Sequence, residues 1–203
     1  MKFRIFLFII FFAGAIMAWD NYRDFNQDLA SGRIYNTFTD KIYFQITFNT
    51  PDYVFQYYNY LADKMGLSEE DKSNLIHRKV SYAERYLWFN VVAKAGSMQE
   101  LVWNNSDFVY IITDMGMKFY PEVMGPGTYP KYRPIEVDGH IYDKICWEKS
   151  FGIRFPLSIL DTNCSKETFK MVSAFDNKVL GVWDVQKLRK LYKIEERVVG
   201  GEQ

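Results

Sequence analysis

Residues 41 to 49, KIYFQITFN, decide the fold of this chain. Apolar side chains occupy every second position of the stretch, at Ile42, Phe44, Ile46 and Phe48. Because successive side chains of a strand point to opposite faces, this alternation predicts a β-strand with one face buried in a core.

Directly after this stretch the apolar spacing changes from that of a strand to that of a helix. Thr50 can cap a helix N-terminus, Pro51 suits its first position, and Gly66 ends it, so the sequence predicts a helix over residues 52 to 65. A second helix is expected from Ser68, which is followed by three acidic residues, to about Lys79. The pair forms a two-helix insertion after the first strand.

The rest of the chain contains further short strand-like stretches separated by turn residues. They cover residues 86–95, 107–113, 117–124, 146–156, 169–174 and 179–183. A last helix, capped by Asp184, is expected over residues 185 to 198. About seven strands without a sustained βαβ alternation predict a mainly β (β-rich α+β) fold, a single antiparallel β-sandwich or open barrel.

The order of five stretches also resembles small exported bacterial β-sandwich proteins of unknown function. They are KIYFQITFNTP, LWFNVVAKA, WNNSDFVYIITDMG, WEKSFGIRFP and FDNKVLGVWDV, and the resemblance covers about residues 41 to 185. It implies a compact β-sandwich and export, with no reaction or ligand. This chain departs from the group in its C-terminal helix and in lacking the lipobox cysteine that some members carry.

The first twenty residues, MKFRIFLFIIFFAGAIMAWD, have the layout of a secretory signal. Two basic residues, Lys2 and Arg4, precede an uncharged apolar run that ends at Met17. Small residues gather near its end, before the first acid at Asp20: Ala13, Gly14, Ala15 and Ala18. We expect a signal peptide over residues 1–18, cleaved after Ala18 or Ala15, and a periplasmic or secreted protein that is not stably membrane-inserted. An uncleaved N-terminal anchor is the alternative, although the run is shorter than the roughly 20 residues of a spanning helix.

The predicted organisation of the chain follows from this cleavage. Residues 19–40 form an irregular lead-in, residues 41–199 a single β-sandwich-like domain with its C-terminal helix, and residues 200–203 a tail. Without Lys2 and Arg4 the 25 basic residues fall to 23 against 25 acidic ones, a net charge of −2. Such a chain lacks the basic surface that a nucleic-acid partner requires.

Two cysteines, Cys146 and Cys164, belong to the predicted mature chain. In an oxidising compartment an even pair is typical of one disulfide. Closing the loop of about 18 residues between the two cysteines would contribute about 3 kcal/mol to stability in the chain-entropy model. Two buried free thiols are the alternative, because sequence alone does not show that the two side chains meet.

Residues with catalytic or metal-binding chemistry are few. The chain has two histidines, His77 and His140, and one histidine with the two flexible acids Asp138 and Asp143 nearby is a poor metal-site signal. The polar turn that begins at Asp161 fails the calcium-loop pattern at its sixth and twelfth positions. We therefore predict no catalytic residue, no metal ligand and no cofactor. An envelope hydrolase or thiol enzyme, and a small apolar-ligand or lipid carrier, are the alternative functions.

Aromatic residues make up 18% of the chain, and two groups of tyrosines are the candidates for a binding surface. Tyr53, Tyr57 and Tyr60 lie on one stripe of the first predicted helix, and Tyr129 and Tyr132 lie in a proline-rich loop. They predict a non-enzymatic protein that binds another envelope protein or a polymer. In the alternative interpretation, the stripe borders the core and the loop is a rigid connection.

Overall fold

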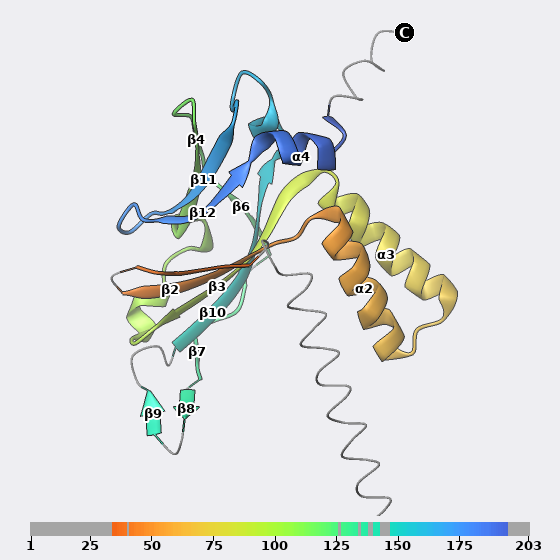
Figure 1. Cartoon of the computed structure of the whole chain (residues 1–203). Helices are drawn as coiled ribbons and strands as arrows, with labels where there is room; N and C mark the ends of the chain where they lie inside the picture. The colour runs from red at the N-terminus through yellow and green to blue at the C-terminus, as the bar shows by residue number, and fades with distance from the viewer. Residues whose placement is uncertain are drawn as a thin grey trace, which may run out of the picture. The chain divides into compact units, whose positions relative to one another are not determined.

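The computed structural model describes residues 34–39, 41–125, 127–133, 135–137, 140–142 and 147–194. These residues form a mixed α+β fold in which two larger antiparallel sheets contribute to one apolar core (Figure 1). The predicted fold class is thereby confirmed, and neither larger sheet closes into a barrel. The predicted signal peptide and tail lie outside the described residues.

The larger sheet has the strand order β1-β2-β3-β10-β6, and β7 also pairs with β10. Its strands are β1 (Ile34–Phe38), β2 (Ile42–Phe48), β3 (Tyr86–Ala95), β6 (Glu122–Met124), β7 (Lys131–Tyr132) and β10 (Trp147–Pro156). The alternation predicted for β2 is confirmed, since its four apolar side chains are buried and the three between them are half-buried. Strand β1 lies in the segment that we expected to be irregular.

The second sheet has the order β12-β11-β4-β5. Its strands are β4 (Val109–Thr113), β5 (Lys118–Phe119), β11 (Thr168–Ser173) and β12 (Val179–Asp184). A separate two-stranded sheet joins β8 (Ile135–Val137) to β9 (His140–Tyr142).

One predicted strand, residues 117 to 124, is divided between the two larger sheets. Its first part, β5, pairs with β4, whereas its second part, β6, pairs with β10 of the other sheet. Pro121 lies between the two parts and is buried. Since proline has no backbone N–H to donate to a ladder, the division falls where a continuous strand would lose a hydrogen bond.

Three α-helices complete the described part of the chain. They are α2 (Pro51–Met65), α3 (Glu69–Ala83) and α4 (Val185–Leu191), and short 3₁₀ turns form η1 (Met98–Leu101), η2 (Asn105–Asp107) and η4 (Leu157–Leu160). The predicted caps Thr50 and Asp184 are confirmed, since each side chain accepts a backbone N–H at the helix start, and Ser68 caps α3 in the same way. Helix α3 extends beyond the predicted Lys79, and α4 ends before the predicted residue 198.

The core between the two larger sheets is rich in aromatic rings. Five phenylalanines are fully buried: Phe44, Phe89, Phe108, Phe155 and Phe169. The Trp183 ring stacks on Phe169 at a centroid distance of 5.4 Å and meets Phe89 edge-on at 5.2 Å. A Cβ atom at Gly181 would lie 2.5 Å from this indole, so a glycine is needed beside it.

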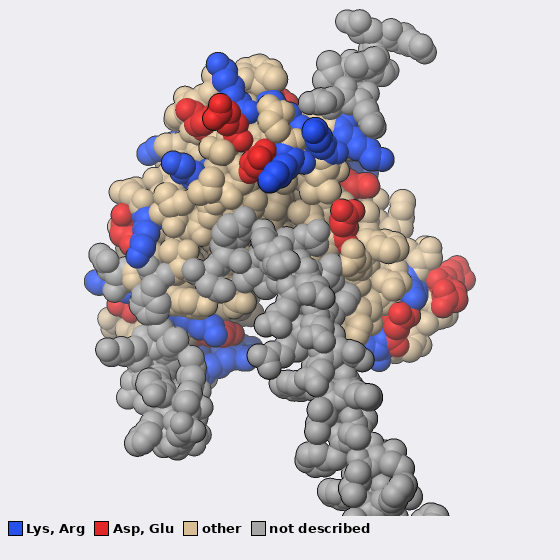
Figure 2. Space-filling view, in the orientation of Figure 1, with Lys and Arg blue, Asp and Glu red and all other residues tan. Residues whose placement is uncertain are grey.

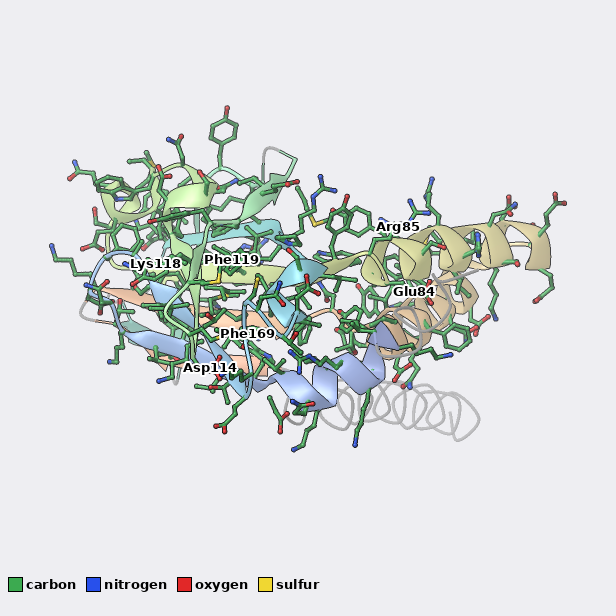
Figure 3. The ribbon with its side chains drawn as sticks, turned by 90° about the horizontal axis from the view of Figure 1, so that it is seen from above. Glu84, Arg85, Asp114, Lys118, Phe119 and Phe169 are labelled. Carbon is green, nitrogen blue, oxygen red and sulfur yellow. The ribbon has the colours of Figure 1, made fainter. Side chains whose placement is uncertain are left out.

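The two ends of β2 and β3 differ, and we name them by what lies there. At the helical end, α2 follows β2, α3 precedes β3, and Val54, Ala83 and Trp88 form a second apolar cluster. Figure 3 labels Glu84 and Arg85 at this end, where α3 meets β3. At the loop end lie the β1–β2 turn and the segment that follows β3, and the β11–β12 turn lies on the same side (Figure 1).

Candidate functional site

Two aromatic side chains of the loop end are unusually exposed for their size. Trp103, between η1 and η2, is 53% exposed, and Phe175, in the β11–β12 turn, is 40% exposed. Their ring centroids lie 5.7 Å apart with the planes at 68°. The two rings thus form a two-sided apolar corner at the surface, although they come from segments about 70 residues apart in the sequence.

The backbone of Trp103 is held by a buried lysine. The Lys149 Nζ donates a 2.7 Å hydrogen bond to the Trp103 carbonyl oxygen and lies 5.1 Å from the centroid of the Phe108 ring. Lys149 is 7% exposed, and burial lowers the pKa of its ammonium group below the ordinary lysine value. A charged group in such a place requires partners, and the carbonyl and the ring face provide them.

Phe175 is held by its turn and by the core. Its ring packs edge-on against the buried Phe108 at 5.4 Å, and its N–H donates to the Ser173 hydroxyl at 3.3 Å. Asn177 of the same turn has a positive φ of 57°, and its amide oxygen accepts a 2.9 Å hydrogen bond from the Tyr110 hydroxyl. The exposed ring therefore belongs to a fixed turn rather than to a loosely attached one.

The corner borders a pocket of about 360 Å³, which we call the Phe175 pocket. It is lined by Thr39, Lys41, Ile42, Gln99, Glu100, Trp103, Phe175 and Asp176. The Thr39 hydroxyl donates to the Ile42 carbonyl oxygen at 2.8 Å and accepts the Ile42 N–H at 3.0 Å, which fixes the β1–β2 turn. The lining combines two aromatic rings with one cation, two carboxylates, an amide and a hydroxyl.

A second pocket, of about 310 Å³, also has Trp103 in its lining, and we call it the Tyr129 pocket. It is lined by Val102, Trp103, Asn104, Asn105, Thr128, Tyr129, Pro130 and Lys149. The loop that forms one wall is joined to β10, because the Thr128 N–H donates to the Ser150 carbonyl at 2.8 Å and its hydroxyl accepts the Ser150 N–H at 2.8 Å. Trp103 is thus common to two neighbouring pockets.

The predicted binding residues of the proline-rich loop lie at the loop end. Tyr129 is 90% exposed and lines the Tyr129 pocket. Tyr132 is 52% exposed and packs edge-on against Trp147 at 5.5 Å. The structure therefore brings Tyr129, but not the helical tyrosines, next to Trp103.

The predicted stripe of tyrosines lies on α2 at the helical end, and all three of its side chains are half-buried. Tyr53 stacks on Tyr57 at 6.0 Å, and Tyr57 meets Tyr58 edge-on at 5.3 Å. Since β3 and β10 pair from Trp147–Ala95 to Pro156–Tyr86, the stripe and the loop belong to opposite ends of this ladder. The two groups do not form the single surface that we predicted, and a binding role for the stripe stays a prediction.

The other residues considered in the sequence analysis are the two cysteines and the two histidines. Cys164 is half-buried and forms no disulfide among the described residues; its predicted partner Cys146 lies outside them, so the disulfide stays a prediction. His77 is exposed on α3, and the side chain of His140 is outside the described part. Among the described residues no group of three His, Cys, Asp or Glu side chains could hold a metal ion.

Charges of both signs share the visible surface. Figure 2 shows Lys and Arg gathered over α4, with Asp and Glu beside them, and a largely uncharged area over the sheets. Within the described ranges, no helix has the length and apolar character needed to cross a membrane.

Sequence reasoning missed Trp103, Phe175 and Lys149. The periodicity of a strand or helix cannot mark the first two, because they stand among turn residues, in WNNS and FDNK. A large aromatic residue inside a turn is itself a usable signal, since a turn offers no buried face for it. Lys149 sits at an inward position of β10, where its charge gives no sign of burial.

Comparisons with protein families, with curated proteins and with solved structures found no match. The function of the chain therefore has to be argued from its own residues. The resemblance in strand order noted above adds no ligand and no reaction to that argument.

Proposed function

We propose that this chain is an exported, non-enzymatic β-sandwich protein of the cell envelope that binds another envelope component, a protein or a polymer, with its loop end. The observation that carries the proposal is the corner formed by Trp103 and Phe175, two large apolar rings kept at the surface. Scattered apolar residues are common on protein surfaces, whereas an aromatic pair that borders a pocket is typical of a binding site.

Fixed rings favour binding for a thermodynamic reason. A side chain that is already ordered loses little conformational entropy when a partner covers it. The Lys149 hydrogen bond to Trp103 and the packing of Phe175 on Phe108 supply this order before any partner arrives. Tyrosine and tryptophan also combine an apolar body with a polar tip, as residues at interfaces commonly do.

The alternative functions have less support. A carrier of small apolar ligands needs an interior space, whereas the region between the two larger sheets is filled by fully buried phenylalanines. No observation on the described residues favours the hydrolase or thiol-enzyme alternative over the binding protein.

Export rests on the sequence of residues 1 to 18 alone. The measurement that tests it is the intact mass of the protein purified from its own host. Loss of the residues up to Ala18 or Ala15 is expected, and a species that retains Met1 to Ala18 would contradict cleavage.

Affinity capture from the host's envelope extract tests the binding role. The mature protein and a Trp103→Ala/Phe175→Ala variant are compared with Phe55→Ala, a matched control whose ring is 51% exposed on α2. We expect one envelope component to be retained by the native protein and by the control, and to be lost with the double variant. Equal capture by all three proteins, or capture of nothing, would contradict binding at the loop end.

A further inference from the structure

We propose that the ligand of the loop end is an uncharged chain of pyranose sugars, at least two units long, which lies across Trp103 and places one unit in each pocket. This inference rests on the proposed function and names its ligand class. It is carried by three features: the presence of Trp103 in the linings of two pockets, the mixed polar lining of the Phe175 pocket, and the second exposed ring at Tyr129.

The placement of Trp103 favours a ligand with repeating units. Each pocket, at about 360 and 310 Å³, lies near the lower end of the range for small-molecule sites, roughly 300 to 1,000 Å³. Two such pockets that share Trp103 in their linings suit a molecule that presents similar units at a short interval. A pyranose ring has an apolar face of C–H groups, which can cover an aromatic face while its hydroxyls point sideways to polar groups.

The polar side chains of the Phe175 pocket match hydroxyl groups. A hydroxyl both donates and accepts hydrogen bonds, and this lining has donors at Lys41 and Gln99 and acceptors at Glu100 and Asp176. A strongly anionic polymer would meet the two carboxylates, and a strongly cationic one would meet the lysine. An uncharged polyol can use all of these groups without that repulsion.

The Tyr129 pocket has the same character with fewer charges. Its lysine is buried and already donates to the Trp103 carbonyl oxygen, so the exposed polar groups are the side chains of Asn104 and Thr128. The Thr128 hydroxyl donates to and accepts from the Ser150 backbone and retains one lone pair that can accept another hydrogen bond. The Tyr129 ring, 90% exposed, offers a second aromatic surface beside Trp103. Amide, hydroxyl and aromatic groups together are suited to a sugar unit rather than to an ion.

Soluble hexasaccharides provide the test. The mature protein is titrated by calorimetry with the β-1,4 and α-1,4 hexamers of glucose, the β-1,4 hexamer of N-acetylglucosamine and the β-1,4 hexamer of mannose. We expect at least one to bind with a dissociation constant below about 1 mM. Trp103→Ala is expected to raise the dissociation constant of that hexasaccharide by about tenfold or more. Trp103→Phe should raise it by less, and Phe55→Ala should leave it unchanged.

Tryptophan fluorescence gives an independent readout. Of the tryptophans in the described residues, Trp88 and Trp183 are buried and Trp147 is half-buried, so a sugar that covers the exposed Trp103 should shift the emission to shorter wavelength. Trp103→Phe should abolish the shift and keep most of the calorimetric binding. A dissociation constant that stays within about twofold between 0.05 and 0.5 M salt is expected for an uncharged ligand, because salt screens only charged contacts.

The outcomes separate this inference from the proposed function. If no hexasaccharide binds, or if binding is indifferent to Trp103→Ala, the sugar ligand is wrong. Should the capture experiment still retain an envelope protein through Trp103 and Phe175, the binding function would stand with a different ligand. If the hexamer and the disaccharide bind and the monosaccharide does not, two sugar units are needed for binding. Equal binding of the monosaccharide would overturn the two-pocket geometry.

Discussion

Trp88 and Trp103 lie at opposite ends of the same sandwich and differ in what surrounds them. Trp88, at the helical end, is 7% exposed, and Tyr82 of α3 packs edge-on against it at 5.5 Å. Trp103, at the loop end, is 53% exposed and borders two pockets. The first ring holds two helices on a sheet, and the second leaves its surface open to solvent.

The difference shows that the high aromatic content of this chain has two explanations. Rings within regular elements pack against other rings, as Trp88 does with Tyr82 and as Tyr53 does with Tyr57. Rings within turns stay half-exposed, although Lys149 holds the Trp103 backbone and Phe175 packs on Phe108. Because the two groups lie at opposite ends of the molecule and differ in exposure, substitutions should separate stability at the helical end from binding at the loop end.

Removal of the ring of Trp88 should have the largest effect. Trp88→Ala takes away the side chain that joins α2 and α3 to the larger sheet, and we expect a loss of about 3 to 5 kcal/mol in the free energy of unfolding. Trp103→Ala, which removes a half-exposed ring, should change it by less than about 1 kcal/mol. Denaturant titration followed by circular dichroism measures both values.

A conservative variant serves as the control for that prediction. The buried Nε1 of Trp88 has no hydrogen-bond partner among the described residues, so Trp88→Phe keeps an aromatic ring and removes an unpartnered N–H. Trp88→Phe should lower the free energy of unfolding clearly less than Trp88→Ala does. Equal losses for Trp88→Ala and Trp103→Ala would show that the two ends do not differ in the way proposed.

The second prediction concerns the loop that bears Tyr129. Gly127 has a φ of +69°, and a Cβ atom there would lie 2.7 Å from the Asn105 Nδ2 and 3.0 Å from the Phe151 Cβ. Gly127→Ala should therefore cost about 1 to 3 kcal/mol in stability and weaken binding at the loop end.

Gly125→Ala is the matched control for the loop. Gly125 has a similar φ of +78°, but nothing lies within 4 Å of the position of its Cβ atom. The difference in unfolding free energy between the two variants isolates the close approach of the loop to Asn105 and Phe151. If the two variants are equally stable, the loop is not held by this contact.

The sequence predicted the regular elements of this fold well, for reasons visible in single residues. Thr50, Pro51 and Gly66 mark the ends of α2 by local hydrogen bonding and backbone geometry, and the alternation in β2 follows directly from its burial. The division of the predicted strand 117–124 into β5 and β6 escaped prediction, because two or three residues show no periodicity of their own and a proline rather than a turn signal separates them.

The loop-end site could not be predicted because its parts meet only in space. Trp103 and Phe175 meet ring to ring at 5.7 Å from distant segments, and Lys149 reaches Trp103 from a strand that lies beyond a long loop. The tyrosine pattern of α2 was visible because its spacing is local. Local spacing, however, does not reveal that the helix packs its tyrosines against one another at the other end of the sheet.

A third prediction concerns the pH dependence of stability, at the end of the second sheet away from Phe175. The Asp114 carboxylate, labelled in Figure 3, accepts the N–H of Lys166 at 3.0 Å, the N–H of Glu167 at 2.7 Å and the Ser165 hydroxyl at 3.1 Å. These hydrogen bonds, that of Lys166 first, lower its pKa from 3.8 to about 2. Since the folded pKa lies below the unfolded one, the stabilisation is complete above a pH of about 4 and is lost as the pH falls toward about 2.

Asp114→Asn tests this dependence. The variant should melt at a lower temperature than the native protein at pH 7, and binding at the loop end should stay unchanged. The gap in melting temperature between the two proteins should narrow as the pH falls from about 4 toward about 2. Asp161→Asn is the control, because Asp161 makes its hydrogen bonds with the described residues through its backbone. A gap between native protein and Asp114→Asn that is constant from pH 7 to pH 3 would contradict the role of the carboxylate.

The smallest effect on stability is expected at Tyr129, where the side chain is 90% exposed. Tyr129→Ser should change the free energy of unfolding by no more than about 0.5 kcal/mol, because little of the ring is removed from water by folding. Tyr53→Ser, at a half-buried ring that stacks on Tyr57, should cost measurably more. If Tyr129→Ser nevertheless weakens capture or hexasaccharide binding several-fold while Tyr53→Ser does not, the ring at the loop end serves binding and the ring on α2 serves packing. The reverse result would return the binding surface to the helical stripe.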